Sequence, residues 1–257
     1  MLHTYPTSDH ILAFSTTRHG GVSTGNYASF NANHYCGDKP EDVKANRELL
    51  CKEIGVAGNH LIVPHQTHKT VTCIIDEAFL SLPEEEQKSR LEGVDAVCTN
   101  LTDVCICVST ADCIPVLLYD ETSGVISAVH AGWRGTVARI VKENIKVLTS
   151  IYGINPANLH AIVGPGISLE AFEVGDEVYE AFKEANFDMN AICKKYEKWH
   201  IDLPLCNKLQ LLDMGLKEEN IVLSGICTFN NPDKFFSARR LGINSGRILN
   251  GIVKKKY

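Results

Sequence analysis

The chain has 257 residues, of which 44% are hydrophobic and 22% charged, and its formal net charge is −6. This balance is typical of an ordinary globular protein of enzyme size and excludes a largely disordered chain. The acidic excess argues against nucleic acid as the main partner, because no broad cationic surface is available to neutralise phosphates. One continuous domain over residues 1–257 is expected, within the size of a large α/β unit.

The sequence also predicts a cellular location. Residues 1–10 lack the cationic start and apolar core of a secretory signal, and no stretch of about 18 apolar residues is available to span a bilayer. The ten cysteines are therefore expected to be reduced thiols, mostly buried, in a cytoplasmic protein with no membrane partner. The basic run 254–256 is expected to be a solvated, frayed end.

Hydrophobic periodicity predicts a mixed succession of strands and helices. Strands are predicted at residues 11–14, 61–63, 71–75, 94–98, 104–108, 114–119, 125–129, 159–163 and 221–226, and helices at 40–54, 135–152, 176–185 and 205–214. Residues 81–90 are polar and acidic and are expected to form a surface helix or loop. The four strands between residues 94 and 129 give the densest sheet signal in the chain.

Two arginines in glycine-containing turns are candidates to bind an anion. Arg18 lies in the polar loop 15–23 beside Gly20-Gly21, which is either an anion-binding loop or an ordinary surface turn. Arg134 lies in the turn that opens the helix 135–152, whose first-turn N–H groups would face the space beside His130. The inner face of that helix is expected to carry Val137, Ile140, Val141, Ile145, Leu148 and Ile151, with Gly153 as its stop.

A thiol and an imidazole are expected to meet at the end of a strand pair. Cys113 precedes the strand 114–119 and His130 follows the strand 125–129, so an antiparallel pair joined by a turn at 120–124 would bring them together. A third ligand is available at a corner between strands, from either His65 or His68. Two imidazoles and one thiolate would hold zinc with a fourth position open, which is typical of a catalytic site.

Two other chemistries use the same residues. Cys113 and His130 would also serve as a thiolate–imidazolium pair for metal-free nucleophilic hydrolysis. A His₂Cys set is also the equatorial ligand set of blue copper, although the sequence has no His-x-His pair and only three methionines, none near Cys113 or His130.

The residues described above resemble the YfiH family, also known as the laccase-domain or multicopper polyphenol oxidase proteins. The similarity runs over nearly the whole chain and rests on an ordered set of motifs: Arg18-His19-Gly20-Gly21-Val22-Ser23, residues 31–38, Gln66-Thr67-His68, Thr110-Ala111-Asp112-Cys113, His130-Ala131-Gly132-Trp133-Arg134-Gly135, Gly164-Pro165-Gly166-Ile167 and Ser237-Ala238-Arg239-Arg240. The chain departs from the family pattern at Lys69, where glycine is usual, and at Ala238, where an aromatic residue is usual.

The resemblance implies an α+β fold, a four-layer α/β/β/α arrangement with mixed sheets. It implies that His68, Cys113 and His130 are the zinc ligands, which selects His68 over His65. It implies phosphorolysis of adenosine, inosine and methylthioadenosine together with adenosine deamination, an older assignment being copper-dependent oxidation of phenols. The implied small-molecule partners are a nucleoside and phosphate.

Roles for the remaining candidates follow from that chemistry. Deamination needs an acid/base group to move protons, and Asp112 is the carboxylate nearest the ligands in sequence. Phosphorolysis needs phosphate to be held beside the ribose, for which Arg18 and Arg134 are the candidates because guanidinium grips phosphate in two-point contacts.

Overall fold

The computed structural model describes residues 1–256, which form short strands and helices in alternation. The strands are β1 (Leu2–Thr4), β2 (Ile11–Thr16), β3 (Leu61–Ile62), β4 (Thr72–Ile74), β5 (Ala96–Thr99), β6 (Cys105–Thr110), β7 (Ile114–Asp120), β8 (Val125–Ala131), β9 (His160–Val163), β10 (Glu173–Val174), β11 (Cys193–Lys195), β12 (Trp199–Ile201), β13 (Ile221–Leu223) and β14 (Ile248–Lys254). The helices are α1 (Pro40–Ile54), α2 (Glu77–Leu80), α3 (Glu84–Arg90), α4 (Trp133–Val137), α5 (Ile140–Tyr152), α6 (Asp176–Glu184), α7 (Met189–Ile192), α8 (Leu203–Asp213) and α9 (Ala238–Leu241).

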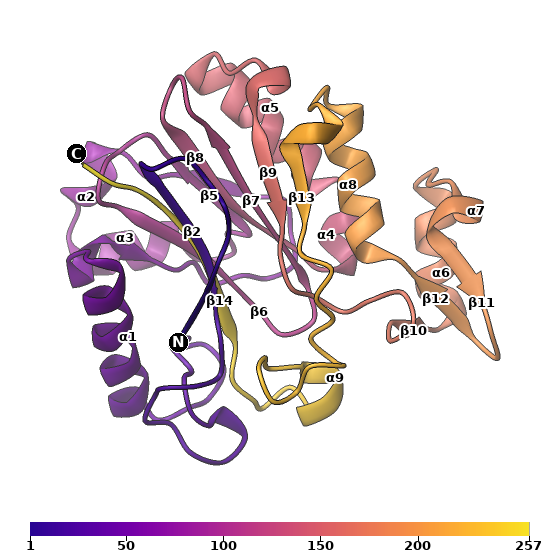
Figure 1. Cartoon of the computed structure of the whole chain (residues 1–257), viewed down its shortest axis with the longest axis horizontal. Coiled ribbons are helices and arrows are strands. Elements are labelled where there is room, and N and C mark those ends of the chain that lie inside the picture. Colours follow the sequence, from indigo (N-terminus) through magenta and orange to yellow (C-terminus); the bar gives the residue numbers. More distant parts are fainter. Residues whose placement is uncertain (257) are drawn as a thin grey trace.

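The strands form two large mixed sheets and one small sheet. The first large sheet has the order β1-β2-β14-β6-β3 and the second has the order β13-β9-β7-β8-β5-β4. The small sheet, β10-β12-β11, lies with α6 and α7 in a lobe at one side of the molecule (Figure 1).

The two large sheets pack face to face and a helical layer covers each outer face, which confirms the expected four-layer fold (Figure 1). Between the sheets, Ile106 and Ile252 of the first sheet meet Leu117 and Ala128 of the second. On the outer side of the first sheet, α1 packs its buried face against β2, β6 and β14. On the outer side of the second sheet, α5 and α8 cover β7 and β8.

The central strands read as continuous apolar runs because both of their faces are covered. Along β7, Val116 and Leu118 point to the helices, whereas Leu117 and Tyr119 point to the other sheet. This is the two-residue alternation of an extended strand. Every residue of β7 and β8 is buried, so the pair forms a rigid support for the residues at its ends.

Helix α1 spans the predicted residues 40–54, with Val43, Leu50 and Ile54 buried as expected. The helix predicted at 135–152 is instead two helices, α4 and α5, because Arg139 between them adopts a left-handed conformation with φ of 63°. The Arg139 guanidinium donates to the carbonyl of Ala185, which fixes the break. Ile151, expected on the inner face, is 55% exposed.

The four closely spaced central strands belong to two sheets, because β6 pairs with β14 and β3 while β5, β7 and β8 belong to the other sheet. One further expectation needs correction. The C-terminal basic run is not a frayed end, because Lys254 completes β14 and the Lys255 ammonium donates to the carbonyls of Ile54 and Gly55 at the end of α1. Cations at a helix C-terminus stabilise its unpaired carbonyls.

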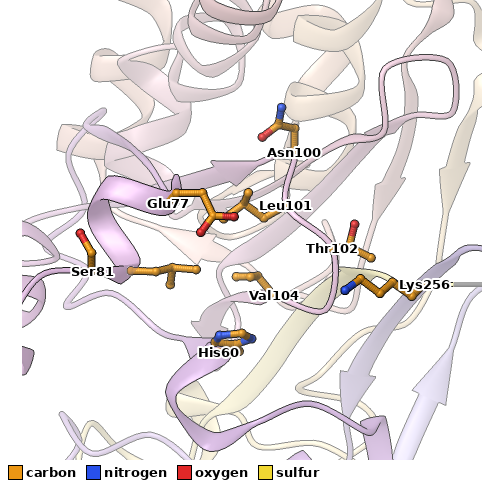
Figure 2. Close-up of a pocket in the computed structure, with 9 residues that line it drawn as sticks. His60, Glu77, Ser81, Asn100, Leu101, Thr102, Val104 and Lys256 are labelled. Atoms are coloured by element: carbon orange, nitrogen blue, oxygen red, sulfur yellow. The ribbon is translucent and has the colours of Figure 1, made fainter.

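One cavity of about 590 Å³ opens at the start of β6, lined by His60, Glu77, Ser81, Thr102, Lys256 and neighbouring residues (Figure 2). It lies at the end of β6 opposite to Thr110, and none of its lining residues is a sequence-predicted site residue. Among residues 1–256, no helix combines the length and the apolar character that a bilayer span requires.

Candidate metal centre

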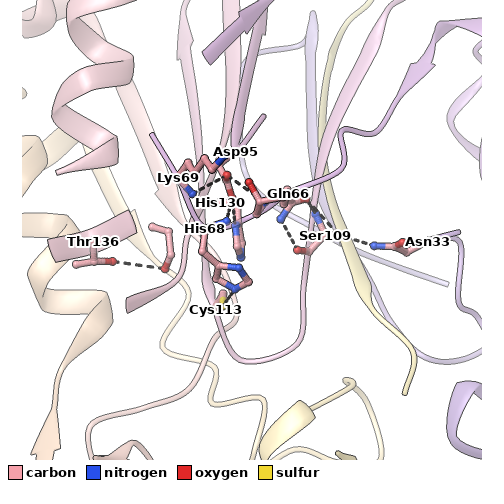
Figure 3. A network of polar contacts seen from close by, with 11 residues as sticks. Asn33, Gln66, His68, Lys69, Asp95, Ser109, Cys113, His130 and Thr136 are labelled. Carbon is pink, nitrogen blue, oxygen red and sulfur yellow. Dashed lines mark hydrogen bonds and ion pairs between the residues drawn. The ribbon is translucent and has the colours of Figure 1, made fainter. Parts of the chain in front are cut away.

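The side chains of His68, Cys113 and His130 converge on one point at the end of the β7–β8 pair (Figure 3). Their three ligand atoms lie within 4.8 Å of one another. The Cys113 Sγ is 4.0 Å from the His68 Nε2, and the centroids of the two imidazole rings are 4.9 Å apart. The cluster is open on one side, since His68 is exposed and Cys113 half-buried while His130 is buried.

Strand register brings the thiol and the buried imidazole together. β7 and β8 run antiparallel with Pro115 opposite His130 and Ile114 opposite Ala131, so Cys113 at the start of β7 lies beside the end of β8. His68 comes from the loop that follows β3, which is anchored to β6 through Gln66. The Gln66 side chain accepts from the amide of Ser109 and donates to the carbonyl of Ser109, at 2.7 and 2.8 Å.

A buried carboxylate that the sequence analysis did not identify organises the cluster. Asp95 Oδ1 accepts from His130 Nδ1 at 2.8 Å and from the amide of His68 at 2.9 Å. Its Oδ2 accepts from the amides of Lys69 and Thr67, at 2.8 and 3.2 Å. Asp95 therefore orients one ligand through its ring and a second through its backbone (Figure 3).

The signal for Asp95 is present in the sequence. It lies inside the apolar run 94–98, and its side chain is fully buried. A buried carboxylate requires charged or hydrogen-bonded partners, so its position in a core strand indicates a polar network at that point. Which groups form this network depends on residues 26–35 positions away, and local patterns do not reveal them.

The hydrogen bond to Asp95 also selects the tautomer of His130. Because Nδ1 donates to the carboxylate, Nε2 is the ring nitrogen that faces the cluster and would bind a metal ion. Burial alone would raise the pKa of Asp95, but the hydrogen bond and charge of His130 together with the Lys69 and Thr67 amides hold the pKa below its ordinary value. Asp95 is therefore a carboxylate at neutral pH.

Without a metal, the thiol and the buried imidazole stabilise each other's charged forms. Burial would raise the pKa of Cys113, but the charge of His130 and hydrogen bonds from His130 and His68 lower it to about 6. Burial would lower the pKa of His130, but the charge of Cys113 and the hydrogen bond to Asp95 raise it to about 9. A thiolate is thus available at neutral pH, which is the form that binds metals.

The donor set fits zinc. Zinc–nitrogen bonds of about 2.0–2.1 Å and zinc–sulfur bonds of about 2.3 Å separate tetrahedral ligand atoms by roughly 3.5 Å. The three donor atoms here, within 4.8 Å of one another, need only small side-chain adjustments to reach that spacing. Copper accepts the same donor set, so the donors alone do not choose the metal.

A glycine keeps the space at the cluster open. A Cβ at Gly132, which follows β8 directly, would lie 2.8 Å from His68 Cδ2 and 3.0 Å from Cys113 Sγ. The φ of Gly132 is −68°, which any residue adopts, so glycine is required here by the close approach of the two ligands alone.

Asp112 is adjacent to the cluster, but its carboxylate is bonded to a different part of the chain. Its Oδ1 accepts from Thr228 Oγ1 at 2.6 Å and its Oδ2 accepts from the amide of Arg239 at 2.7 Å. Asp112 has a φ of 96°, a left-handed conformation that is costly for a residue with a Cβ. The two hydrogen bonds hold that conformation and with it the backbone that presents Cys113.

The two candidate arginines lie in different environments. Arg18 donates to the carbonyls of Ala28 and Pro232, at 3.0 and 2.7 Å. Two amides of its glycine loop are also satisfied within the protein, Gly21 by the Ser29 hydroxyl and Val22 by the Asn46 side chain. Arg134 lies over the ring of Trp133, 4.3 Å from its centroid, and within residues 1–256 its guanidinium has no ion pair or hydrogen bond.

His65 lies outside the cluster. Its Nδ1 pairs with the carboxylate of Glu92 at 2.7 Å, and its ring stacks on Tyr35 with centroids 4.3 Å apart. Of the two histidines in the 64–68 corner, only His68 is directed at Cys113 and His130.

The chain is similar to known proteins over nearly its whole length. The family model described as "Multi-copper polyphenol oxidoreductase laccase" matches residues 12–255. A protein of Bacteroides thetaiotaomicron named "Purine nucleoside phosphorylase" is 47% identical over 250 residues, which cover 96% of this chain and 93% of that protein. "Adenosine deaminase RL5", from an unknown prokaryotic organism, is 44% identical over 247 residues, 95% of this chain and 94% of that protein. The crystal structure of YlmD from Geobacillus stearothermophilus superposes with a TM-score of 0.91 at 27% identity and covers 98% of this chain and 94% of that one.

Proposed function

Because the chain belongs to the laccase-like YfiH/YlmD family, whose curated relatives are named purine nucleoside phosphorylases and adenosine deaminase, we propose that it is a zinc-dependent purine nucleoside enzyme. Its main reaction is phosphorolysis of adenosine, inosine or methylthioadenosine to the free base and the (methylthio)ribose 1-phosphate, with adenosine deamination as a second activity. The observation that carries the proposal is the convergence of His68, Cys113 and His130 at an open end of the sheet.

Three protein ligands support a catalytic rather than a closed structural zinc site. Zinc held by three side chains keeps a fourth position for water or substrate, where it polarises an oxygen or lowers the pKa of the bound water. The exposed side of the cluster, at His68, is where a nucleoside reaches it.

The chain's own residues supply position and charge. Asp95 holds the His130 ring and the His68 backbone in place, and Gly132 leaves room above the ligands. Arg134, two residues beyond Gly132, lies over the Trp133 ring and makes no ion pair or side-chain hydrogen bond among residues 1–256, so it is the candidate to bind phosphate. Arg18, with two of its donors on backbone carbonyls, is assigned to the phosphate only through its remaining N–H groups.

Asp112 is assigned a positioning role rather than proton transfer. Both of its oxygens accept hydrogen bonds, at 2.6 and 2.7 Å, from groups that belong to the chain around Thr228 and Arg239. A carboxylate acting as a general base needs a lone pair directed at the substrate. Asp112 thus links the thiolate ligand to the segment that carries α9.

The ten cysteines are all free thiols. This supports the proposal that the protein works in a reducing compartment such as the cytoplasm, where thiols persist.

The proposal is tested by incubating zinc-loaded protein with adenosine, with and without phosphate, and resolving adenine, inosine and ribose 1-phosphate. Phosphate-dependent adenine and ribose 1-phosphate establish phosphorolysis, and inosine establishes deamination. Absence of all three products removes the proposal. Cys113→Ala should lose both metal and activity, while Cys193→Ala, a half-buried thiol outside the cluster, should keep both.

The same samples separate the two alternatives. Oxygen consumption with a phenol and bound copper would support the oxidase named in the family description. Activity that survives a chelator and disappears on alkylation of Cys113 would support the metal-free hydrolase, for which the thiolate–imidazolium pair of the unmetallated cluster provides the nucleophile.

A further inference from the structure

A second cavity, of about 800 Å³, is lined by α1 and by the chain around α3. Both segments lie on the side of the first sheet away from α5 and α8 (Figure 1). Its volume falls within the range of roughly 300–1,000 Å³ that is typical of small-molecule sites. Its lining comes from α1, β3, α3 and the loop around Tyr35, and it contains none of His68, Cys113 and His130.

The floor of this cavity is apolar. Val43 of α1, Leu61 and Val63 around β3, and Leu91 after α3 are all buried and line it. Such a floor favours an occupant with an apolar body, because burying apolar surface contributes about 25 cal/mol per Å².

The charges at the cavity only partly neutralise one another. Lys88 pairs with Glu84 at 2.9 Å and with Glu85 at 3.0 Å. Lys44 and Glu48 carry opposite charges and lie one turn apart on α1, but they form no ion pair, so Lys44 can still attract an anion. Beyond these residues, the lining carries one more charge, the guanidinium of Arg47.

Arg47 has no carboxylate partner within residues 1–256. Its Nη2 donates to the carbonyl of Leu61 at 3.0 Å, and its Nη1 lies 3.4 Å from His34 Nδ1. Burial, together with the charges of Arg47, Lys88 and His65, lowers the pKa of His34 to about 4, so His34 is neutral and accepts from Arg47. A guanidinium carries five N–H groups, so the other donors of Arg47 are available to an anion in the cavity.

From this arrangement we propose that the cavity is a binding site for a small amphipathic monoanion, an apolar or aromatic body that carries one carboxylate, sulfonate or phosphodiester group. The anionic group pairs with Arg47, and the body lies on the floor formed by Val43, Leu61 and Leu91. The carboxylates of Glu48 and Glu84 line the same cavity and disfavour a polyanion such as a nucleoside triphosphate. This site is separate from the metal centre and does not depend on the proposed reaction.

The test uses anilinonaphthalene sulfonate, an aromatic monoanion that fluoresces when bound, and N-phenylnaphthylamine, which has the same aromatic body without the sulfonate. The wild-type protein should bind the sulfonate saturably at one site. Arg47→Gln should weaken sulfonate binding about tenfold or more, while the affinity for the neutral amine should change less than about twofold, because only the charge-assisted hydrogen bonds are lost.

Two further variants control the measurement. Lys52→Gln removes a positive charge from α1 at a residue outside the cavity lining and should bind the sulfonate like wild type. Lys44→Gln changes an exposed residue of the lining and should weaken sulfonate binding about two- to fivefold. If Arg47→Gln does not fold, Lys44→Gln tests whether a positive charge at the cavity contributes to sulfonate binding.

Several results would overturn the proposal. The first is that the wild-type protein shows no saturable binding of the sulfonate. The second is that Arg47→Gln, or Lys44→Gln if Arg47→Gln does not fold, binds the sulfonate as tightly as wild type, or that the variant loses affinity for the neutral amine as much as for the sulfonate. The third is that adenosine displaces the sulfonate, which would place the probe at the metal centre.

Discussion

Replacing Asp95 with asparagine tests whether one buried carboxylate organises the metal centre. The carboxylate accepts four hydrogen bonds, two at each oxygen, from His130 and from three consecutive amides. Asparagine offers one oxygen and one NH₂ group in the same volume. In either orientation at least two of the four donors face the NH₂ group and lose their acceptor.

The size of the effect follows from these bonds. Leaving a buried donor unpaired costs about 1–3 kcal/mol, and breaking a buried charged pair by changing one partner costs about 3–5 kcal/mol. We expect the free energy of unfolding of the metal-free Asp95→Asn protein to fall by about 3–5 kcal/mol. Because His130 and His68 both lose their support, the zinc affinity should fall about 10- to 100-fold, the usual cost of removing a group that orients ligands.

Urea unfolding in the presence of a chelator measures the first quantity, and competition with a chromophoric zinc chelator measures the second. Asp120→Asn is the matched control, because Asp120 is also a buried aspartate but lies at the far end of β7 and accepts from Thr122 and Ser123 in the turn. It should lose about 1–2 kcal/mol of stability and keep the wild-type zinc affinity. Wild-type zinc affinity in Asp95→Asn would refute the reasoning.

Three further predictions follow from the same structure. Gly132→Ala should weaken zinc binding about tenfold or more in the competition assay, because the added Cβ would lie 2.8 Å from His68 Cδ2. In the control variant Gly58→Ala the added Cβ would meet nothing within 4 Å, so the zinc affinity should equal that of wild type. In metal-free protein the Cys113 thiolate forms as the pH rises through its pKa of about 6, so the alkylation rate should rise with a midpoint near pH 6, and a midpoint near 9 would contradict the ion pair. Leu148→Ala, fully buried, should lower the free energy of unfolding by about 2–5 kcal/mol in urea, whereas Ile151→Ala, 55% exposed, should change it by less than about 0.5 kcal/mol.

Local patterns are sufficient to predict the two strands beside the metal centre and the helix α1. The strands 114–119 and 125–129 are apolar runs joined by a short polar turn, and the structure pairs them antiparallel, as the turn predicts. The bounds of α1 follow from Pro40 in its first turn and a left-handed Gly55 at its end. In both cases the deciding interactions are between residues close in sequence.

The remainder depends on contacts between distant parts of the chain. The break between α4 and α5 is fixed by the bond from Arg139 to Ala185, which a continuous helical periodicity does not reveal. The assignment of β6 to a different sheet from β5 and β7 depends on its pairing with β14, more than one hundred residues later. The proposed catalytic role of Asp112 came from its adjacency to Cys113, whereas the direction of its side chain is set by Thr228 and Arg239.

In the candidate metal centre, two carboxylates support the three candidate ligands. His68, a candidate ligand, and Asp112, the residue before Cys113, both adopt a left-handed backbone conformation, with φ of 63° and 96°. This conformation costs about 1–3 kcal/mol for each non-glycine residue. In each case a carboxylate compensates: Asp95 binds the amides on both sides of His68, and Asp112 uses its own carboxylate to fix itself to Thr228 and Arg239. These two strained turns direct the His68 imidazole and the Cys113 thiolate, which come from different loops, toward the buried ring of His130. Since these hydrogen bonds are within the protein, the three candidate ligands are held in position without an ion, and little of the free energy of metal binding would be needed to order the loops.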